Sequence, residues 1–235
     1  MYFGLAIVGL WALAMAGWYL LPNAMATVYD LLIVGMTKKW YAAVLKRIEP
    51  NSRVFDIGIG TATALLKNKH IVLERKLTVI GIDYEKPYVV KAKQAVAEAG
   101  MGLSELVHVH HLSIHDPNLR AAFSGKAAFD AAYFSGSLTL LPDPAGALKI
   151  AAAMLKPGGC VYVTQTFQNQ PAPIMSRLKP LLRRFTSIDF GRLTYYSEVQ
   201  TIAAKAGMKV IEDGPIPGSI DTRYQTARLV VLKPM

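Results

Sequence analysis

The stretch Arg53–Thr63, RVFDIGIGTAT, places an acid at the end of an apolar run and follows it with two glycines spaced by one residue. Asp56, Gly58 and Gly60 would lie where a strand ends and the chain turns, and glycine there lets a ligand approach the backbone. A purely structural turn would use the same glycines. The pattern favours a cofactor site, but NAD is disfavoured because the dinucleotide fingerprint needs a third glycine where this chain has Thr63.

A second acid, Asp83, ends the next apolar run, TVIGIDYE. A carboxylate at the carboxyl end of a strand can accept hydrogen bonds from both hydroxyls of a ribose. Asp56 can face a cationic amino group, which a pyrophosphate would not require. S-adenosylmethionine carries both an adenosyl and an ammonium group, so we predict it as the cofactor.

Short apolar runs alternate with helical patterns from Arg53 onward. The strand candidates are Arg53–Ile57, Leu77–Asp83, Leu106–His111, Phe129–Phe134, Cys160–Gln165, Met208–Glu212 and Ala227–Leu232. The helix candidates are Ala62–Leu73, Tyr88–Ala99, Asn118–Phe123, Pro144–Leu155 and Glu198–Ala206. This alternation predicts an α/β fold with a mostly parallel sheet covered on both faces. The last two strands, with no helix between them, are predicted to pair antiparallel, and KPGG, Lys156–Gly159, is predicted as a turn before a strand.

Five segments in order, VFDIGIGTAT, VIGIDYE, LSIHDP, FDAAYFSGSLTLLPDP and LKPGGCVYVTQ, resemble the motifs of class I S-adenosylmethionine-dependent methyltransferases. The resemblance runs from about Tyr29 to the C-terminus. It implies a Rossmann-like, seven-stranded, mostly parallel sheet with a reversed last strand. It also implies that Asp56, Gly58 and Gly60 line the methionine part of the cofactor, that Asp83 holds the ribose and that Tyr84 flanks the adenine.

The same resemblance adds Ser113, Ile114 and Ser135 to the candidate cofactor-binding residues. Ser113 stands where many members have an acid that contacts the adenine amino group, and Asp116 is the alternative. Phe134–Gly136 replaces the Asn-Pro-Pro-Tyr signature of enzymes that methylate nucleobase or glutamine nitrogens, so those acceptors are disfavoured. YDLL, which begins at Tyr29, is similar to the lead-in helix of quinone-biosynthesis methyltransferases.

No Asp, Glu, Lys, Arg or His occurs between Met1 and Tyr29, and the apolar run Tyr2–Leu21 is long enough to cross a bilayer. A cleaved signal peptide is the alternative, since Ala14–Ala16 resembles a cleavage site, but a basic n-region is missing. We therefore expect an anchor over residues 1–22, lead-in helices over 23–50 and a methyltransferase domain over 51–235. Basic residues follow the apolar run, which predicts a domain on the cytosolic or matrix-equivalent side, with the mitochondrial inner membrane or the endoplasmic reticulum as the candidate membrane.

The net charge of +10 fits attraction to anionic lipid headgroups, and no nucleic-acid-binding module is recognisable. SRLKPLLRRF, Ser176–Phe185, fits either a solvated helix or an interfacial basic patch. Cys160 is the only cysteine, which excludes an intramolecular disulfide and a multi-cysteine zinc site.

Four histidines gather between His108 and His115. A zinc site is disfavoured because Asp116 is the only acid nearby and no cysteine is close. His115 follows a strand end and is a candidate general base. Methyl transfer often needs little beyond alignment of the reacting groups, so the catalytic residues stay unassigned.

The leading hypothesis is an S-adenosylmethionine-dependent methyltransferase that acts on a lipophilic or membrane-associated acceptor. One alternative is a methyltransferase-like accessory or assembly subunit of a membrane complex, with little or no catalysis. A nicotinamide-dependent oxidoreductase is a third and weaker possibility. The expected partners are the bilayer and a lipophilic small molecule or membrane-complex subunits, without nucleic acid or metal.

Overall fold

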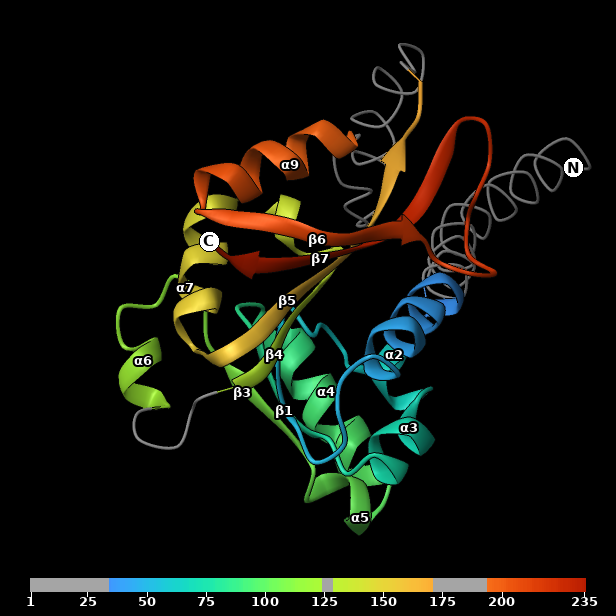
Figure 1. Cartoon of the computed structure of the whole chain (residues 1–235). Coiled ribbons are helices and arrows are strands. Elements are labelled where there is room, and N and C mark those ends of the chain that lie inside the picture. Colours follow the sequence, from blue (N-terminus) through green and yellow to red (C-terminus); the bar gives the residue numbers. More distant parts are fainter. Residues whose placement is uncertain (1–33, 124–128, 171–193) are drawn as a thin grey trace, which may run out of the picture. The chain divides into compact units, whose positions relative to one another are not determined.

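The computed structural model describes residues 34–123, 129–170 and 194–235 (Figure 1). Its strands are β1 Arg53–Ile57, β2 Thr78–Asp83, β3 Val107–His111, β4 Phe129–Ser135, β5 Leu155–Gln168, β6 Met208–Pro215 and β7 Gln225–Pro234. They form one seven-stranded sheet in the order β3-β2-β1-β4-β5-β7-β6. The predicted anchor, the YDLL segment and SRLKPLLRRF lie outside the described residues.

The sheet changes direction at its last strand. β1 pairs in parallel with β2 and β4, β2 with β3, and β4 with β5. β7 runs antiparallel to both of its neighbours, β5 and β6. The predicted seven-stranded sheet with a reversed last strand is therefore confirmed, as is the antiparallel pairing of the last two strands.

The KPGG segment differs from its prediction as a turn before a strand, because it lies within β5. Phe129 pairs with Leu155 and Ala131 with Cys160, so the β5 side of the pairing contains extra residues between the two pairs. Gly158, with φ 86°, lies in this irregular part. KPGG therefore forms a β-bulge within β5, and the strand continues on both sides of it.

The helices that the structure gives with bounds are α2 Thr63–Leu66, α3 Lys69–Glu74, α4 Lys86–Glu98, α5 Met101–Ser104, α6 Leu119–Ala122, α7 Pro144–Ala153 and α9 Tyr196–Lys205, with a 3₁₀ turn η1 at Leu138–Leu140. The single helix predicted over Ala62–Leu73 is wrong, because it is divided into α2 and α3. Asn68 lies at the division, and its side-chain amide donates to the carbonyls of Lys38 and Ala64, each at 2.9 Å. A tertiary contact thus interrupts a continuous helical pattern.

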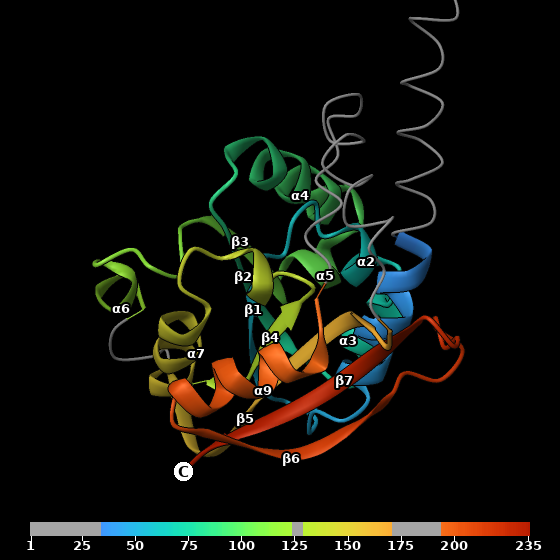
Figure 2. The ribbon, with the colours of Figure 1, turned by 90° about the horizontal axis from the view of Figure 1, so that it is seen from above.

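The helices cover both faces of the sheet (Figures 1 and 2). One hydrophobic core joins the sheet to α2, α3, α4 and α5, through residues such as Leu65, Val72 and Val96. A second core joins the other face to α7 and α9, with Leu148 and Val199 among its members. The carboxyl ends of the parallel strands meet at one edge of this three-layer arrangement, where ligands bind in open α/β sheets.

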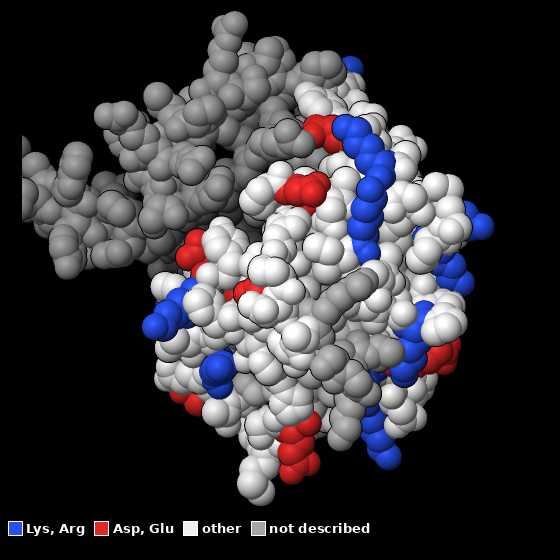
Figure 3. Space-filling view, turned by 90° about the vertical axis from the view of Figure 1, so that its left-hand side faces the viewer, with Lys and Arg blue, Asp and Glu red and all other residues white. Residues whose placement is uncertain are grey.

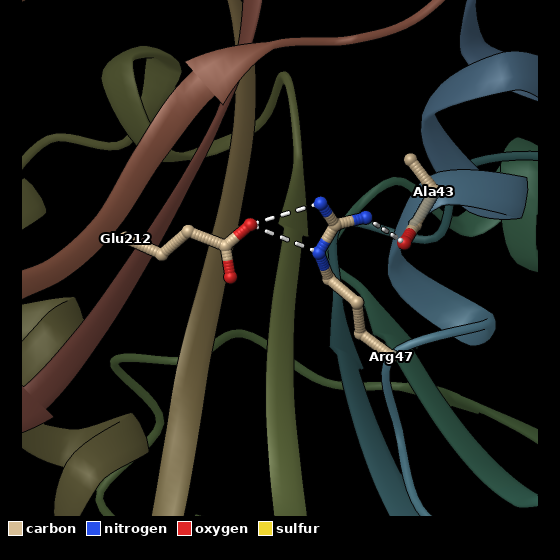
Figure 4. Close-up of polar contacts among 3 residues, drawn as sticks. All are labelled: Ala43, Arg47 and Glu212. Carbon is tan, nitrogen blue, oxygen red and sulfur yellow. Dashed lines mark hydrogen bonds and ion pairs between the residues drawn. The ribbon is translucent and has the colours of Figure 1, made fainter.

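A helix over residues 34–45 precedes β1, and we call it the lead-in helix. Trp40, Tyr41, Val44 and Leu45 are buried in the first core, at the spacing of one helix face. Just after the helix, Arg47 donates to Glu212 of β6 at 2.9 and 3.1 Å and to the carbonyl of Ala43 (Figure 4). Packing rather than this exposed ion pair holds the helix, since such pairs contribute about 0–1 kcal/mol.

Within the described residues, we find no helix with both the length and the apolar character needed to cross a membrane.

Candidate functional site

Asp56 lies in β1 with 1% of its surface exposed. The Tyr41 hydroxyl of the lead-in helix donates a hydrogen bond of 2.7 Å to its Oδ2, whereas its Oδ1 is buried without a hydrogen-bond partner. Burial raises the pKa of Asp56 to about 7, the Tyr41 hydrogen bond acts against this rise, and the charge of Asp83 adds to it. A buried carboxylate oxygen without a partner is costly unless a ligand supplies a donor.

Asp83 ends β2, the strand that pairs with β1. Its Oδ2 accepts a hydrogen bond of 2.9 Å from the Gly60 amide, and its Oδ1 accepts one of 2.9 Å from the Glu85 amide. Burial raises the pKa of Asp83, and the amide hydrogen bonds oppose that rise. Asp83 therefore holds the glycine turn after β1 and the residue that precedes α4 in fixed positions.

The two glycines of the turn have different surroundings. A Cβ built on Gly58, where φ is 79°, would lie 2.6 Å from the Cβ of Ser137. The Ser137 hydroxyl in turn donates to the carbonyl of Ile57. A Cβ on Gly60, where φ is 60°, would meet nothing within 4 Å. Gly58 thus makes room for the protein's own side chain, and Gly60 borders open space.

Tyr84 and Ser113, which are predicted near the adenine, and the further candidates Ile114 and Asp116 lie after β2 and β3. Tyr84 is 65% exposed, and its carbonyl is 2.9 Å from Nε2 of His111. The Ser113 hydroxyl accepts from the His115 amide at 3.2 Å. Ile114 is buried in the second core, so its side chain serves packing. Asp116 accepts from the Asn118 amide and caps a turn.

The carboxyl ends of β4 and β5 carry a second pair of polar groups. Ser135 Oγ and Gln165 Oε1 are both buried without a hydrogen bond of normal geometry, although the Ser135 hydroxyl lies near enough to Tyr133 to favour the ionised form of that phenol. A Cβ on Gly136 would lie 3.4 Å from the Trp40 ring and 3.9 Å from Gln165 Oε1. These two strands therefore end in buried hydrogen-bond acceptors next to an aromatic side chain of the lead-in helix.

The remaining candidates are the histidines on and after β3 and Cys160. His115 Nε2 is buried without a hydrogen-bond partner, and the His110 ring packs edge-on against Phe123. Burial, followed by the charges of Lys93 and His108, lowers the pKa of His110. Across residues 34–123, 129–170 and 194–235, no three or more metal-ligating side chains gather into a possible metal site. Cys160 is partly buried, which raises the pKa of its thiol.

Sequence reasoning did not identify Tyr41, Ser137 or Gln165 as members of this region. Tyr41 had a usable signal, since it belongs to the apolar face of the lead-in helix and a buried tyrosine hydroxyl needs a partner. Ser137 and Gln165 carried no comparable signal, because their roles depend on how loops and strands meet. The roles predicted for Asp56, Gly58, Gly60, Asp83, Tyr84, Ser113, Ile114 and Ser135 remain predictions.

Comparison with known proteins gives one family match, to the methyltransferase domain family, over residues 55–161. The uncharacterized protein YjhP of Escherichia coli is 28% identical over 136 residues, which cover 57% of this chain and 50% of YjhP. The chain thus matches about half the length of that relative. A phosphatidylethanolamine N-methyltransferase of Cereibacter sphaeroides is 24% identical over 179 residues, covering 74% of this chain and 79% of that protein.

Among solved structures, an S-adenosylmethionine-dependent methyltransferase from Geobacter sulfurreducens in complex with S-adenosylhomocysteine has the same fold. It superposes with a TM-score of 0.57 at 16% identity and covers 84% of this chain and 90% of that one. The matched segment, residues 55–161, contains Asp56, both glycines and Asp83. The family match and the shared fold together support the predicted enzyme class, an S-adenosylmethionine-dependent methyltransferase, and the predicted cofactor.

Proposed function

We propose that this protein transfers a methyl group from S-adenosylmethionine to a lipophilic acceptor at a membrane. The observation that carries the proposal is the site at the ends of β1 and β2, where the free oxygen of Asp56 and the open space at Gly60 lie on either side of one tight turn. A carboxylate oxygen that lacks a donor fits an ammonium group, and glycines in a turn fit close approach of a ligand.

The residues of this chain fit that cofactor in defined roles. Asp56 would accept from the ammonium group, Gly60 would leave room for the ligand, and Asp83 would accept from the ribose with the lone pairs that its two amide hydrogen bonds leave free. When bound, S-adenosylmethionine supplies an electrophilic methyl group on a sulfonium. The protein then contributes alignment and exclusion of water, which can provide much of the rate enhancement in group transfer.

The acceptor would bind at the ends of β4 and β5. Ser135 Oγ and Gln165 Oε1 can accept hydrogen bonds there, which favours a nucleophile that carries hydrogen, such as an amine or a hydroxyl group. Similarity to a phosphatidylethanolamine N-methyltransferase supports an amine on a lipid as one such acceptor. The apolar run near the N-terminus supports a lipid-borne rather than a freely soluble molecule.

The described residues that follow the N-terminal segment in the chain support membrane contact. Lys38 and Lys39 are exposed on the lead-in helix, and Asn68 joins that helix to the α2–α3 junction. An open cavity of about 490 Å³ adjoins this junction and combines apolar and basic lining: Thr63, Leu66, Lys67, Lys69, His70, Ala95 and Ala99. On the face drawn in Figure 3, by contrast, basic and acidic side chains are interspersed. Basic residues beside an apolar surface suit anionic headgroups on the cytosolic or matrix-equivalent side.

Calorimetric titration of the full chain in mild detergent with S-adenosylmethionine tests the cofactor. We expect saturable binding, and the absence of binding at millimolar ligand would remove the premise. The acceptor is tested separately with vesicles of phosphatidylcholine alone, or with added phosphatidylethanolamine or a membrane-soluble hydroquinone, and labelled methyl donor. Incorporation into one added component identifies its class. Cofactor binding without transfer to any of them would contradict a lipophilic acceptor of these classes.

A further inference from the structure

We propose that Tyr41 is a positioning residue for the cofactor: its hydroxyl orients the Asp56 carboxylate so that Oδ1 faces the ammonium group of the bound nucleoside. This inference rests on the proposed use of S-adenosylmethionine and adds to it a residue of the lead-in helix. Nothing in the glycine motif or in the matched segment includes Tyr41, since the segment begins at residue 55.

The geometry divides the two oxygens of Asp56 between two tasks. Oδ2 is occupied by the Tyr41 hydroxyl at 2.7 Å, and Oδ1 is left without a donor. Tyr41 is itself 3% exposed, and its ring meets that of Tyr133 edge-on at 5.0 Å. A hydroxyl on a packed ring has little freedom to turn away, so the carboxylate is held in one orientation before any ligand arrives.

The groups around Asp56 do not neutralise the negative charge of its carboxylate. The groups that face it in the described part of the chain are Tyr41 from the lead-in helix, Asp83 from β2 and Tyr133 from β4. None of them is positively charged. Burial and Asp83 raise the pKa of Asp56, and the Tyr41 hydrogen bond opposes that rise by favouring the ionised form. A ligand ammonium would supply the missing positive charge at Oδ1.

This arrangement couples ligand binding to a proton. Without ligand, Asp56 is largely protonated below about pH 7, and an ammonium group prefers the carboxylate. Binding should therefore release a proton below this pH and should become tighter as the pH rises towards it. Tyr41→Phe would remove the hydrogen bond that favours the carboxylate, which would move the midpoint of the binding curve to higher pH.

The test is calorimetric titration of the full chain in mild detergent with S-adenosylhomocysteine, which has the same amino acid end, between about pH 5.5 and 8.5. For Tyr41→Phe we expect about tenfold weaker binding near neutral pH and a midpoint higher by about one pH unit, the size expected for one hydrogen bond to a charged group. Tyr162→Phe is the matched control. Tyr162 is a buried tyrosine of β5 that is not among the groups facing Asp56. The pH midpoint of binding by Tyr162→Phe should therefore stay at the wild-type value.

Asp56→Asn separates a positioning role from a fold defect. It keeps an oxygen for Tyr41 but cannot ionise, so its weakened binding should lose the pH dependence. An unchanged midpoint in Tyr41→Phe, with affinity lost equally at every pH, would overturn the positioning role and leave the proposed function intact. Failure of the wild-type chain to bind S-adenosylhomocysteine at any of these pH values would overturn both.

Discussion

The two halves of the sheet edge differ in how their polar groups are held. At the ends of β1 and β2, Asp83 accepts two backbone amides and Asp56 accepts a tyrosine hydroxyl, so these carboxylates are oriented by the protein. At the ends of β4 and β5, Ser135 Oγ and Gln165 Oε1 have no donors. The first half is preorganised, as suits a cofactor of constant structure. The second keeps free hydrogen-bonding capacity, as suits a group whose donor arrives with the substrate.

Burying the Asp56 carboxyl group in the first half has a cost in folding stability. The pH dependence of this cost is the largest effect that we expect. The pKa of Asp56 is raised to about 7 from 3.8. Between these values the unfolded chain has released the proton and the folded chain still holds it, so stability falls as pH rises through this window. A pKa difference of about three between the folded and unfolded chain lowers the free energy of unfolding by about 4 kcal/mol across this window.

Urea unfolding of wild type and Asp56→Asn in mild detergent measures this term from about pH 4 to pH 7.5. The wild-type chain should lose stability relative to the variant as pH rises. A difference that is constant with pH would mean that Asp56 ionises near its ordinary pKa and would remove the contrast between the two halves.

Asp83→Asn should weaken S-adenosylhomocysteine binding by about 100-fold, since hydrogen bonds to a charged acceptor contribute about 1.5–3 kcal/mol each. The substitution turns one acceptor into an NH₂ group that faces the amide of Gly60 or Glu85. Asp143→Asn is the matched control, because Asp143 accepts the Gly146 amide at the start of α7. It should change stability by less than about 1 kcal/mol, because Asn and Asp are about equally good N-cap residues, and should leave affinity unchanged. Wild-type affinity in Asp83→Asn would contradict the role assigned to this carboxylate.

The two glycines separate binding from folding within the first half. Gly60→Ala should reduce S-adenosylhomocysteine affinity about tenfold, because the new Cβ would occupy the open space proposed for the ligand. It should lower stability by about 1–2 kcal/mol, because alanine is strained at φ 60°. Gly58→Ala should lower stability by about 2–3 kcal/mol through the clash with Ser137. Gly58→Ala with Ser137→Gly should recover part of that loss in thermal unfolding. No recovery would mean that backbone strain, rather than Ser137, excludes a side chain at Gly58.

The parts of the fold that the sequence predicts are those set by local pattern. β1 has the predicted bounds, and its end at Ile57 and the end of β2 at Asp83 follow from apolar runs that stop at a glycine or an acid. The division of the helix at Asn68 and the continuation of β5 through KPGG depend on contacts with distant segments. The Tyr41–Asp56 hydrogen bond belongs to the second kind. Helical spacing predicts that Tyr41 is buried, but only docking of the lead-in helix decides which group its hydroxyl meets.

The smallest effects are expected in the second half, and they test the comparison most directly. Removing an acceptor that has no partner costs the folded chain little, so Ser135→Ala and Gln165→Leu should change stability by less than about 1 kcal/mol, in either direction. Gln165→Leu should bind S-adenosylhomocysteine within about twofold of wild type, because Gln165 is not among the groups that interact with Asp56 or Asp83. A loss of affinity in Ser135→Ala would instead support the predicted place of Ser135 among the cofactor-binding residues. A stability loss above about 2 kcal/mol would show that these oxygens are satisfied by the protein itself. In that case the two halves would be organised alike, and free acceptor capacity at β4 and β5 could no longer support an acceptor with an amine or hydroxyl group.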